Sequence, residues 1–182
     1  LQGAWGIYAE QVSSDGFVAG HAYVGNQKRA IRWDPNSTAA TLLPSLVAGT
    51  PASATGAGDS GMVVGQSGGR AAAWDASGSP VALLPAGSAS EATHIVSDDA
   101  HAGAAATVVF GTHAAGTRLF RATTAGDWAD LGPTPAAGQS FLSVHVVAAP
   151  RRDFMVAVAH TQLYEQKNFL WTAGGGIAAL ES

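Results

Sequence analysis

The stretch RAIRWD, residues Arg29–Asp34, returns further along the chain as RAAAWD, residues Arg70–Asp75. A second match keeps the same order, because TLLP at Thr41–Pro44 returns as ALLP at Ala82–Pro85. Two matches at one spacing indicate an internal repeat. Repeats at such a period decide the fold, so the rest of the chain has to be interpreted in their frame.

Two further and more divergent copies follow. The third contains RLFRAT from Arg118 and ADLG from Ala129, and the fourth contains KNFLWTAGGG from Lys167 and AALE from Ala178. Successive copies are 41 to 49 residues apart. Three positions mark every copy: a basic residue (Arg29, Arg70, Arg118, Lys167), a tryptophan replaced once by alanine (Trp33, Trp74, Ala122, Trp171), and a leucine (Leu43, Leu84, Leu131, Leu180).

Each copy predicts four short strands, because brief apolar runs alternate with turns rich in Ser, Asp and Gly and little helical periodicity is present. In the second copy the strands are expected in SATGAG, GMVVGQS, AAAWD and PVALLP. A four-stranded repeat of about 40–45 residues is typical of a β-propeller blade. One such sheet cannot bury both of its faces alone, so blades stack around an axis. The repeated Trp and Leu are therefore predicted to form the core between blades.

The predicted fold is all-β: a single β-propeller domain over residues 1–182, made of four four-stranded blades closed on themselves. The approximate blades are residues 4–47, 48–88, 89–135 and 136–182. The alternative is part of a larger propeller or array, completed by another chain or by residues outside this sequence. Leu1–Gly3 favours this alternative, since it is similar to the end of a preceding unit's last strand.

The motifs VSSDGFVAG, GMVVGQS and FLWTAGGG resemble the HAF repeat of bacterial extracellular and surface proteins. The resemblance covers nearly the whole chain in four copies. It is weakest in the third copy, where Ala122 replaces the expected Trp. The resemblance implies a propeller-like fold and a bacterial location that is extracellular, periplasmic or at the cell surface. It implies no defined activity.

Composition excludes several classes of partner. The net charge is −4 and the nine basic residues are scattered, whereas nucleic-acid binding needs clustered Lys and Arg. No apolar run approaches the roughly 20 residues of a membrane-spanning helix. The absence of cysteine removes disulfides and thiolate metal sites. The predicted partners are therefore a protein or a glycan, without nucleic acid or membrane insertion, and an oligomer remains compatible with the sequence.

Two strings imitate functional motifs. Gly65–Gly69 (GQSGG) satisfies the G-x-S-x-G pattern of a hydrolase nucleophile elbow, which would expose Ser67 between a strand and a helix. The repeat instead aligns the following Ala run with strands, so Ser67 is predicted in a β-hairpin. Ser13–Gly16 (SSDG) lacks the acidic spacing of a calcium loop, and turn geometry accounts for its residues.

A metal or acid–base site is one hypothesis for the propeller axis. Aligning the predicted innermost strands places Glu10, Thr55, His94 and, with a one-residue gap, His145 at equivalent positions. If these side chains faced the axis, Glu10, His94 and His145 would converge. One carboxylate and two imidazoles suit a divalent metal, and equally an acid–base pair. The alternative is isolated polar residues satisfied by backbone or water. No other cofactor is predicted.

Five aromatic residues have no counterpart in the other copies, so packing symmetry does not account for them: Trp5, Tyr8, Tyr23, Trp128 and Tyr164. They are the candidate ligand-binding residues. Three functions remain open: a non-catalytic binding or scaffold module of unknown ligand, which we favour over an enzyme; a lectin-like carbohydrate-binding propeller; and a hydrolase or lyase acting at the channel. The fold alone does not decide among them.

Overall fold

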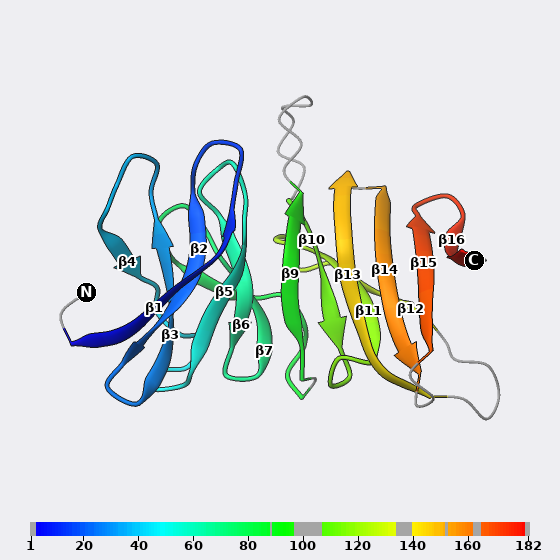
Figure 1. The fold of residues 1–182 in the computed structure, drawn as a ribbon, viewed down its shortest axis with the longest axis horizontal. Helices are drawn as coiled ribbons and strands as arrows, with labels where there is room; N and C mark the ends of the chain where they lie inside the picture. The colour runs from blue at the N-terminus through cyan, green and yellow to red at the C-terminus, as the bar shows by residue number, and fades with distance from the viewer. Residues whose placement is uncertain are drawn as a thin grey trace.

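The computed structural model describes residues 3–87, 89–96, 107–133, 140–151, 153–161 and 165–180. These residues form sixteen strands and no helix. The strands make four antiparallel sheets of four strands each, and each sheet holds one copy of the repeat (Figure 1). The prediction of an all-β propeller with four four-stranded blades is therefore confirmed.

Each blade is made of four strands that are consecutive in the sequence. The first blade contains β1 (Ala4–Val12), β2 (Val18–Val24), β3 (Gln27–Trp33) and β4 (Ala40–Leu42). The second contains β5 (Ala52–Ala57), β6 (Val63–Ser67), β7 (Arg70–Trp74) and β8 (Pro80–Ala82). The third contains β9 (Glu91–Val96), β10 (Val108–His113), β11 (Arg118–Thr123) and β12 (Trp128–Gly132). The fourth contains β13 (Phe141–Arg151), β14 (Phe154–Thr161), β15 (Gln166–Thr172) and β16 (Gly176–Leu180).

Each blade is a meander in which neighbouring strands in sequence are neighbours in the sheet. The hairpin between β6 and β7 shows why the sequence folds this way. Its two linking residues, Gly68 and Gly69, have φ values of 60° and 79°. A two-residue hairpin turn with positive φ at both positions favours glycine. The turn places Ser67 opposite Arg70 and continues directly into a strand, so the hairpin predicted around Ser67 is confirmed.

The repeated glycine of the second strand is required by a close approach of the backbone. A Cβ atom on Gly20 would lie 2.0 Å from the Tyr8 carbonyl oxygen, and one on Gly65 would lie 2.0 Å from the Ser53 carbonyl oxygen. Opposite these glycines the innermost strand has a register shift that leaves Glu10 or Thr55 without a cross-strand partner. Such a β-bulge bends the strand and turns its extra side chain in a new direction.

The core lies between the blades, as the repeated tryptophans predict. Trp74 is fully buried in a cluster with Ala19 and Ala30 of the first blade. Its indole N–H donates to the Pro44 carbonyl at 2.7 Å. Trp171 is buried likewise between the third and fourth blades, within a cluster that includes Val108, Phe110 and Leu119.

Two polar links join the first blade to turns of the second. The buried Arg32 guanidinium donates from Nη1 to the carbonyl oxygens of Gly61 at 2.7 Å and Ala76 at 3.0 Å. The Asp59 carboxylate accepts the Asp15 backbone N–H at 3.3 Å. A hydrogen bond from the Ser14 hydroxyl holds the pKa of Asp59 below its usual range. The SSDG stretch is thus a turn that binds the neighbouring blade.

The four blades form an open arc. Figure 1 shows the first blade at one end, the fourth at the other, and the two termini on opposite sides. Strand packing joins first to second, second to third and third to fourth blade, and no packing of similar extent joins the first to the fourth among the described strands. The expectation that four blades close on themselves is therefore wrong for the described chain, whose arrangement matches part of a larger ring.

Within its described residues the chain has no helix long and apolar enough to cross a membrane.

Candidate functional site

Four aromatic rings of the first blade form a continuous cluster on β1 and β2. Tyr8 lies opposite His21 in the ladder, and the two rings stack with centroids 4.8 Å apart. Trp5 stacks on Tyr23 with centroids 4.7 Å apart, and Tyr8 meets Tyr23 edge-on at 6.2 Å. We call Trp5, Tyr8, His21 and Tyr23 the aromatic cluster.

The cluster combines an exposed surface with a fixed base. Trp5 and Tyr8 are 68% and 49% exposed, whereas His21 is buried beneath them. The Trp5 indole N–H donates to the Gly25 carbonyl at 2.7 Å, which fixes the orientation of the ring. Gly6 leaves room for the rings, because a Cβ there would lie 3.1 Å from the Tyr8 ring. Exposed apolar groups held in one orientation are a property of binding surfaces.

Glu10 connects the aromatic cluster to a charged region. Its Oε1 lies 2.9 Å from Nδ1 of His21. Burial lowers the pKa of His21, the positive charge of Lys28 lowers it further, and Glu10 opposes both effects. Because desolvation disfavours the imidazolium, His21 is neutral near pH 7.

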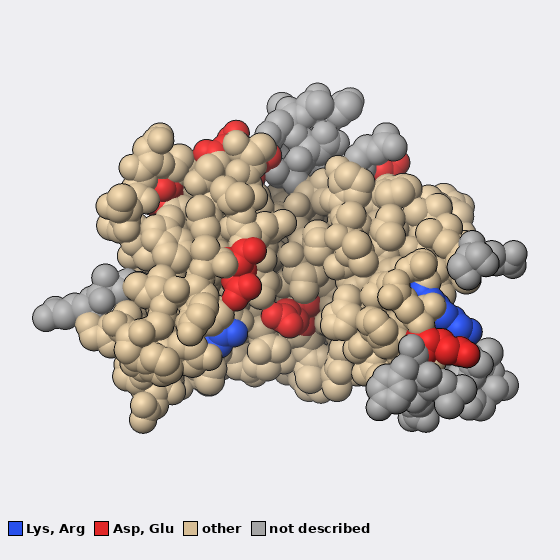
Figure 2. All heavy atoms as spheres, viewed as in Figure 1, with Lys and Arg blue, Asp and Glu red and all other residues tan. Residues whose placement is uncertain are grey.

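Glu91, at the start of β9 in the third blade, faces the same region. Burial raises the pKa of the Glu91 carboxyl; Lys28 and His145 oppose this effect, and Glu10 adds to it. Residues of four strands therefore act on one another electrostatically across the inner side of the arc. Figure 2 shows acidic side chains in the middle of this face, where it is hollowed, with a basic side chain beside them. We call Glu10, Lys28 and Glu91 the charged hollow.

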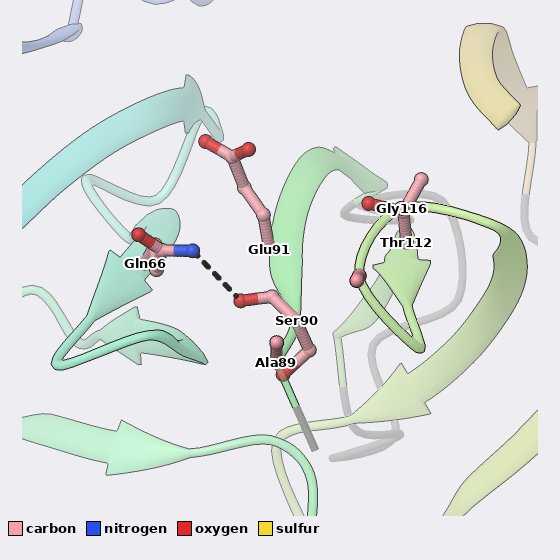
Figure 3. Close-up of a pocket in the computed structure, with 7 residues that line it drawn as sticks. Gln66, Ala89, Ser90, Glu91, Thr112 and Gly116 are labelled. Atoms are coloured by element: carbon pink, nitrogen blue, oxygen red, sulfur yellow. Dashed lines mark hydrogen bonds between the residues drawn. The ribbon is translucent and has the colours of Figure 1, made fainter. Parts of the chain in front are cut away.

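A small cavity of about 210 Å³ adjoins Glu91. Its lining is mostly small or polar: Gln66, Ala89, Ser90, Glu91, Thr112, Ala115 and Gly116. The Gln66 side-chain amide donates to the Ser90 carbonyl at 3.3 Å, and the Glu91 side chain extends from β9 beside this hydrogen bond (Figure 3). The cavity offers carboxylate, amide and hydroxyl groups for hydrogen bonding next to the charged hollow.

The structure does not bring Glu10, His94 and His145 together as metal ligands. Glu10 pairs with His21, whereas Nδ1 of His94 lies 3.1 Å from the Thr93 hydroxyl. His145 packs against the ring of His160 at 6.1 Å. Over the ranges that the structure describes, no group of three or more His, Asp or Glu side chains is arranged to hold a metal ion.

The β-bulges of the innermost strands explain why the sequence alignment of Glu10 with His94 and His145 failed. At the equivalent bulge of each blade, the ladder skips Glu10 in the first blade, Thr55 in the second, Thr93 in the third and Val147 in the fourth. His94 therefore lies one residue beyond the equivalent position and His145 two residues before it. The predicted equivalence of His94 and His145 with Glu10 is therefore wrong. The sequence does not show where a strand bulges, so an alignment of strands by residue spacing cannot include the extra residue.

The candidate aromatic residues separate into groups. Trp5, Tyr8 and Tyr23 lie together in the aromatic cluster. Trp128 lies on β12, the outermost strand of the third blade, where it is opposite Ala122 and meets the ring of His113 edge-on at 5.7 Å. Tyr164 lies outside the described residues.

Sequence reasoning missed His21, Lys28 and Glu91. The alternation of His21 and Tyr23 along one strand would have placed both on one face. No pattern in the sequence identified Glu91, because the burial of its side chain depends on how neighbouring blades pack. Ser67 has a structural role: its buried hydroxyl accepts the Leu46 backbone N–H at 2.9 Å.

No protein-family model matches the chain, and no curated protein does. Among solved structures, a catalytically inactive variant of virginiamycin B lyase from Staphylococcus aureus, solved with quinupristin, is similar with a TM-score of 0.57 at 18% identity. The match covers 94% of this chain and 54% of the lyase. The selenomethionine-substituted lyase gives a TM-score of 0.56 at 15% identity, over 98% of this chain and 55% of that one. The chain thus has the β-propeller fold of the lyase and spans about half of its length.

Proposed function

We propose that this propeller is a non-catalytic binding module that takes a carbohydrate at the aromatic cluster and the charged hollow. The observation that supports the proposal is the pair of exposed rings, Trp5 and Tyr8, held in fixed orientation beside Glu10. The C–H face of a sugar ring packs on an aromatic face, and carboxylates accept hydrogen bonds from its hydroxyl groups. Few polar groups beside aromatic surface are typical of a small-molecule site.

Glycan-array screening followed by calorimetry of the bound glycan tests this function. Trp5→Ala is expected to weaken binding at least about tenfold, because it removes most of the exposed stacking surface. Trp128→Ala is the matched control, since it removes the same side chain from another blade. Binding that survives Trp5→Ala but is lost with Trp128→Ala would contradict the assignment of the site, and no binding to any glycan would reject the ligand class.

The proposed location is outside the cytoplasm: extracellular, periplasmic or at the cell surface. Its support is the resemblance of the sequence to bacterial extracellular repeats. Fractionation of cells that make the native protein tests it, and recovery from the cytoplasmic fraction alone would reject it.

A hydrolase or lyase acting at the charged hollow is the second candidate. Glu91 is the observation in its favour, because a carboxyl with a raised pKa keeps its proton to higher pH, as a general acid must. Assays with glycosides and with quinupristin would detect turnover. If turnover is found, Glu91→Gln is expected to abolish it, because the amide cannot donate the proton that the carboxyl would. Turnover unchanged in Glu91→Gln would exclude this residue as the acid.

A further inference from the structure

The cavity beside Glu91 lies between the second and third blades. Gln66 lines it from β6, and the other lining residues come from β9, β10 and the segments next to these strands. Its volume is about 210 Å³. Pockets for drug-sized ligands begin at roughly 300 Å³. The cavity is therefore of a size for one sugar ring or for a substituent of a sugar.

Thr112 places a buried hydroxyl group at this cavity. The residue is 9% exposed, and its hydroxyl has no hydrogen-bond partner among the described residues. In Figure 3 the hydroxyl oxygen points from β10 toward the strand that carries Glu91. A buried polar group without a partner is unfavourable, so this hydroxyl is available to a ligand that enters the cavity.

Glu91 adds a carboxylate next to this hydroxyl. It is the cross-strand partner of Thr112, and residues directly opposite each other in an antiparallel pair have their side chains on one face of the sheet. The Glu91 carboxylate makes no hydrogen bond or ion pair with any described residue. Burial raises the pKa of this carboxyl, which is the expected effect where no partner replaces the lost hydration.

Gln66 supplies a third polar group. Its side-chain N–H donates to the Ser90 carbonyl at 3.3 Å. The side-chain oxygen of the same amide has no hydrogen-bond donor in the part of the chain that the structure describes. The unpaired groups at the cavity are thus a carboxylate, an amide oxygen and a hydroxyl. All three accept hydrogen bonds, and one of them carries a negative charge when ionised.

A primary ammonium group has the complementary properties. It carries a positive charge, three N–H donors and no acceptor, whereas a hydroxyl group has one donor and no charge. An anionic substituent would be repelled by Glu91. Lys28 does not fill this role, because it forms no ion pair with Glu91 in the described chain. Together with Glu10, Glu91 leaves the charged hollow with more negative than positive charge.

We propose that the carbohydrate taken by this propeller is an amino sugar, whose ammonium group enters the cavity and binds the Glu91 carboxylate, the Gln66 amide oxygen and the Thr112 hydroxyl. This inference rests on the proposed carbohydrate function and names the class of its ligand. The aromatic cluster holds another ring of the same oligosaccharide, since Glu10 beside that cluster is close enough to affect Glu91 electrostatically.

Three β-1,4-linked tetrasaccharides that differ only at C2 of each ring test the inference. The glucosamine tetramer has an ammonium group there, the N-acetylglucosamine tetramer an acetamide and cellotetraose a hydroxyl. Calorimetry at a pH where the amino groups are charged gives the three dissociation constants. The glucosamine tetramer is expected to bind at least about tenfold more tightly than either of the others, because its hydrogen bonds to Glu91 are charge-assisted.

Two variants and a control examine the groups of the cavity. Glu91→Gln removes the charge with little change of shape, and is expected to bring the three dissociation constants within about twofold of one another. Thr112→Val removes only the hydroxyl and is expected to reduce the preference severalfold. Asp127→Asn removes an exposed carboxylate from the same blade and should leave the preference unchanged. Circular dichroism establishes that each variant is folded.

The outcomes separate this inference from the function on which it rests. Equal binding of the three tetrasaccharides, weakened by Trp5→Ala, would overturn the amino-sugar ligand and leave the carbohydrate function in place. A preference for the glucosamine tetramer that Glu91→Gln does not change would overturn the cavity as its site. If none of the three binds, the amino-sugar ligand is overturned, and the glycan array alone decides the carbohydrate function.

Discussion

At the scale of single residues, the site depends on a histidine kept neutral by its surroundings. His21 supports the Tyr8 ring from below and contacts Glu10 beside it. Burial lowers its pKa, and the Glu10 carboxylate limits that decrease. The neutral imidazole is therefore both a packing group for Tyr8 and the partner of the Glu10 carboxylate.

Replacing Glu10 by Gln is expected to lower the pKa of His21 further. The substitution removes the negative charge that favours the imidazolium, while the burial of His21 and the charge of Lys28 remain. NMR titration of the imidazole resonances measures the change, with His94 as the internal control on another blade. A rise in the pKa of His21, or an equal change at His94, would contradict the electrostatic assignment.

At the scale of strands and sheets, the repeated glycines fix where the innermost strand bulges. The bulges determine which side chains reach the inner side of the arc, because one extra residue changes the face of every residue after it. Gly65 in particular allows the Ser53 carbonyl to lie where a side chain would otherwise start.

Gly65→Ala is expected to destabilise the second blade by roughly 3 kcal/mol or more, because its Cβ would lie 2.0 Å from the Ser53 carbonyl oxygen. Gly174→Ala is the matched control, since a Cβ there meets nothing within 4 Å. Urea denaturation compares the free energies of unfolding of the two variants. Equal stability of both would show that the backbone yields at Gly65 without cost.

The sequence predicted the elements of this fold better than their register. Apolar runs between Gly-containing turns are local signals, so four strands in each copy, the hairpin at Ser67 and the interblade role of Trp74 could all be predicted. The position of a bulge depends on contacts between strands, so His94 and His145 were aligned with Glu10 incorrectly. Glu91 was missed for the same reason, since its burial arises from neighbouring blades.

At the scale of the whole molecule, curvature was the property that local patterns could not predict. Whether four blades close depends on the angle between successive sheets, and that angle depends on the sizes of side chains at each interface. The side chains differ between interfaces: Phe110 and Trp171 pack together between the third and fourth blades, whereas Trp74 packs against alanines of the first blade.

Stability is expected to fall as the pH drops below about 6.5, the ordinary pKa of histidine. Burial lowers the pKa of His21 and of His94, so the folded state takes up protons at these residues less readily than the unfolded chain does. The stability that these two neutral histidines contribute is fully present above the pKa of histidine in the unfolded chain. It is lost as the pH falls toward their lower pKa values in the folded protein. Glu91 has the opposite sign: its raised pKa stabilises the fold at low pH, and this contribution is lost as the pH rises.

Urea denaturation at about pH 7.5 and about pH 5.5 measures this dependence. His94→Gln is expected to reduce the loss of stability between the two pH values, since Gln does not titrate. A loss that is unchanged in this variant would mean that His94 does not contribute. A gain in stability on acidification to about pH 5.5 would contradict the sign for the whole protein.

The similar interfaces between successive blades also bear on how such a chain can change over evolution. Every blade begins and ends with the same kind of contact surface, so duplication or deletion of one repeat in the gene creates no new type of interface. The change alters only how far the arc turns. The number of blades in this architecture can therefore change in whole-repeat steps, independently of the residues on the inner side of the arc.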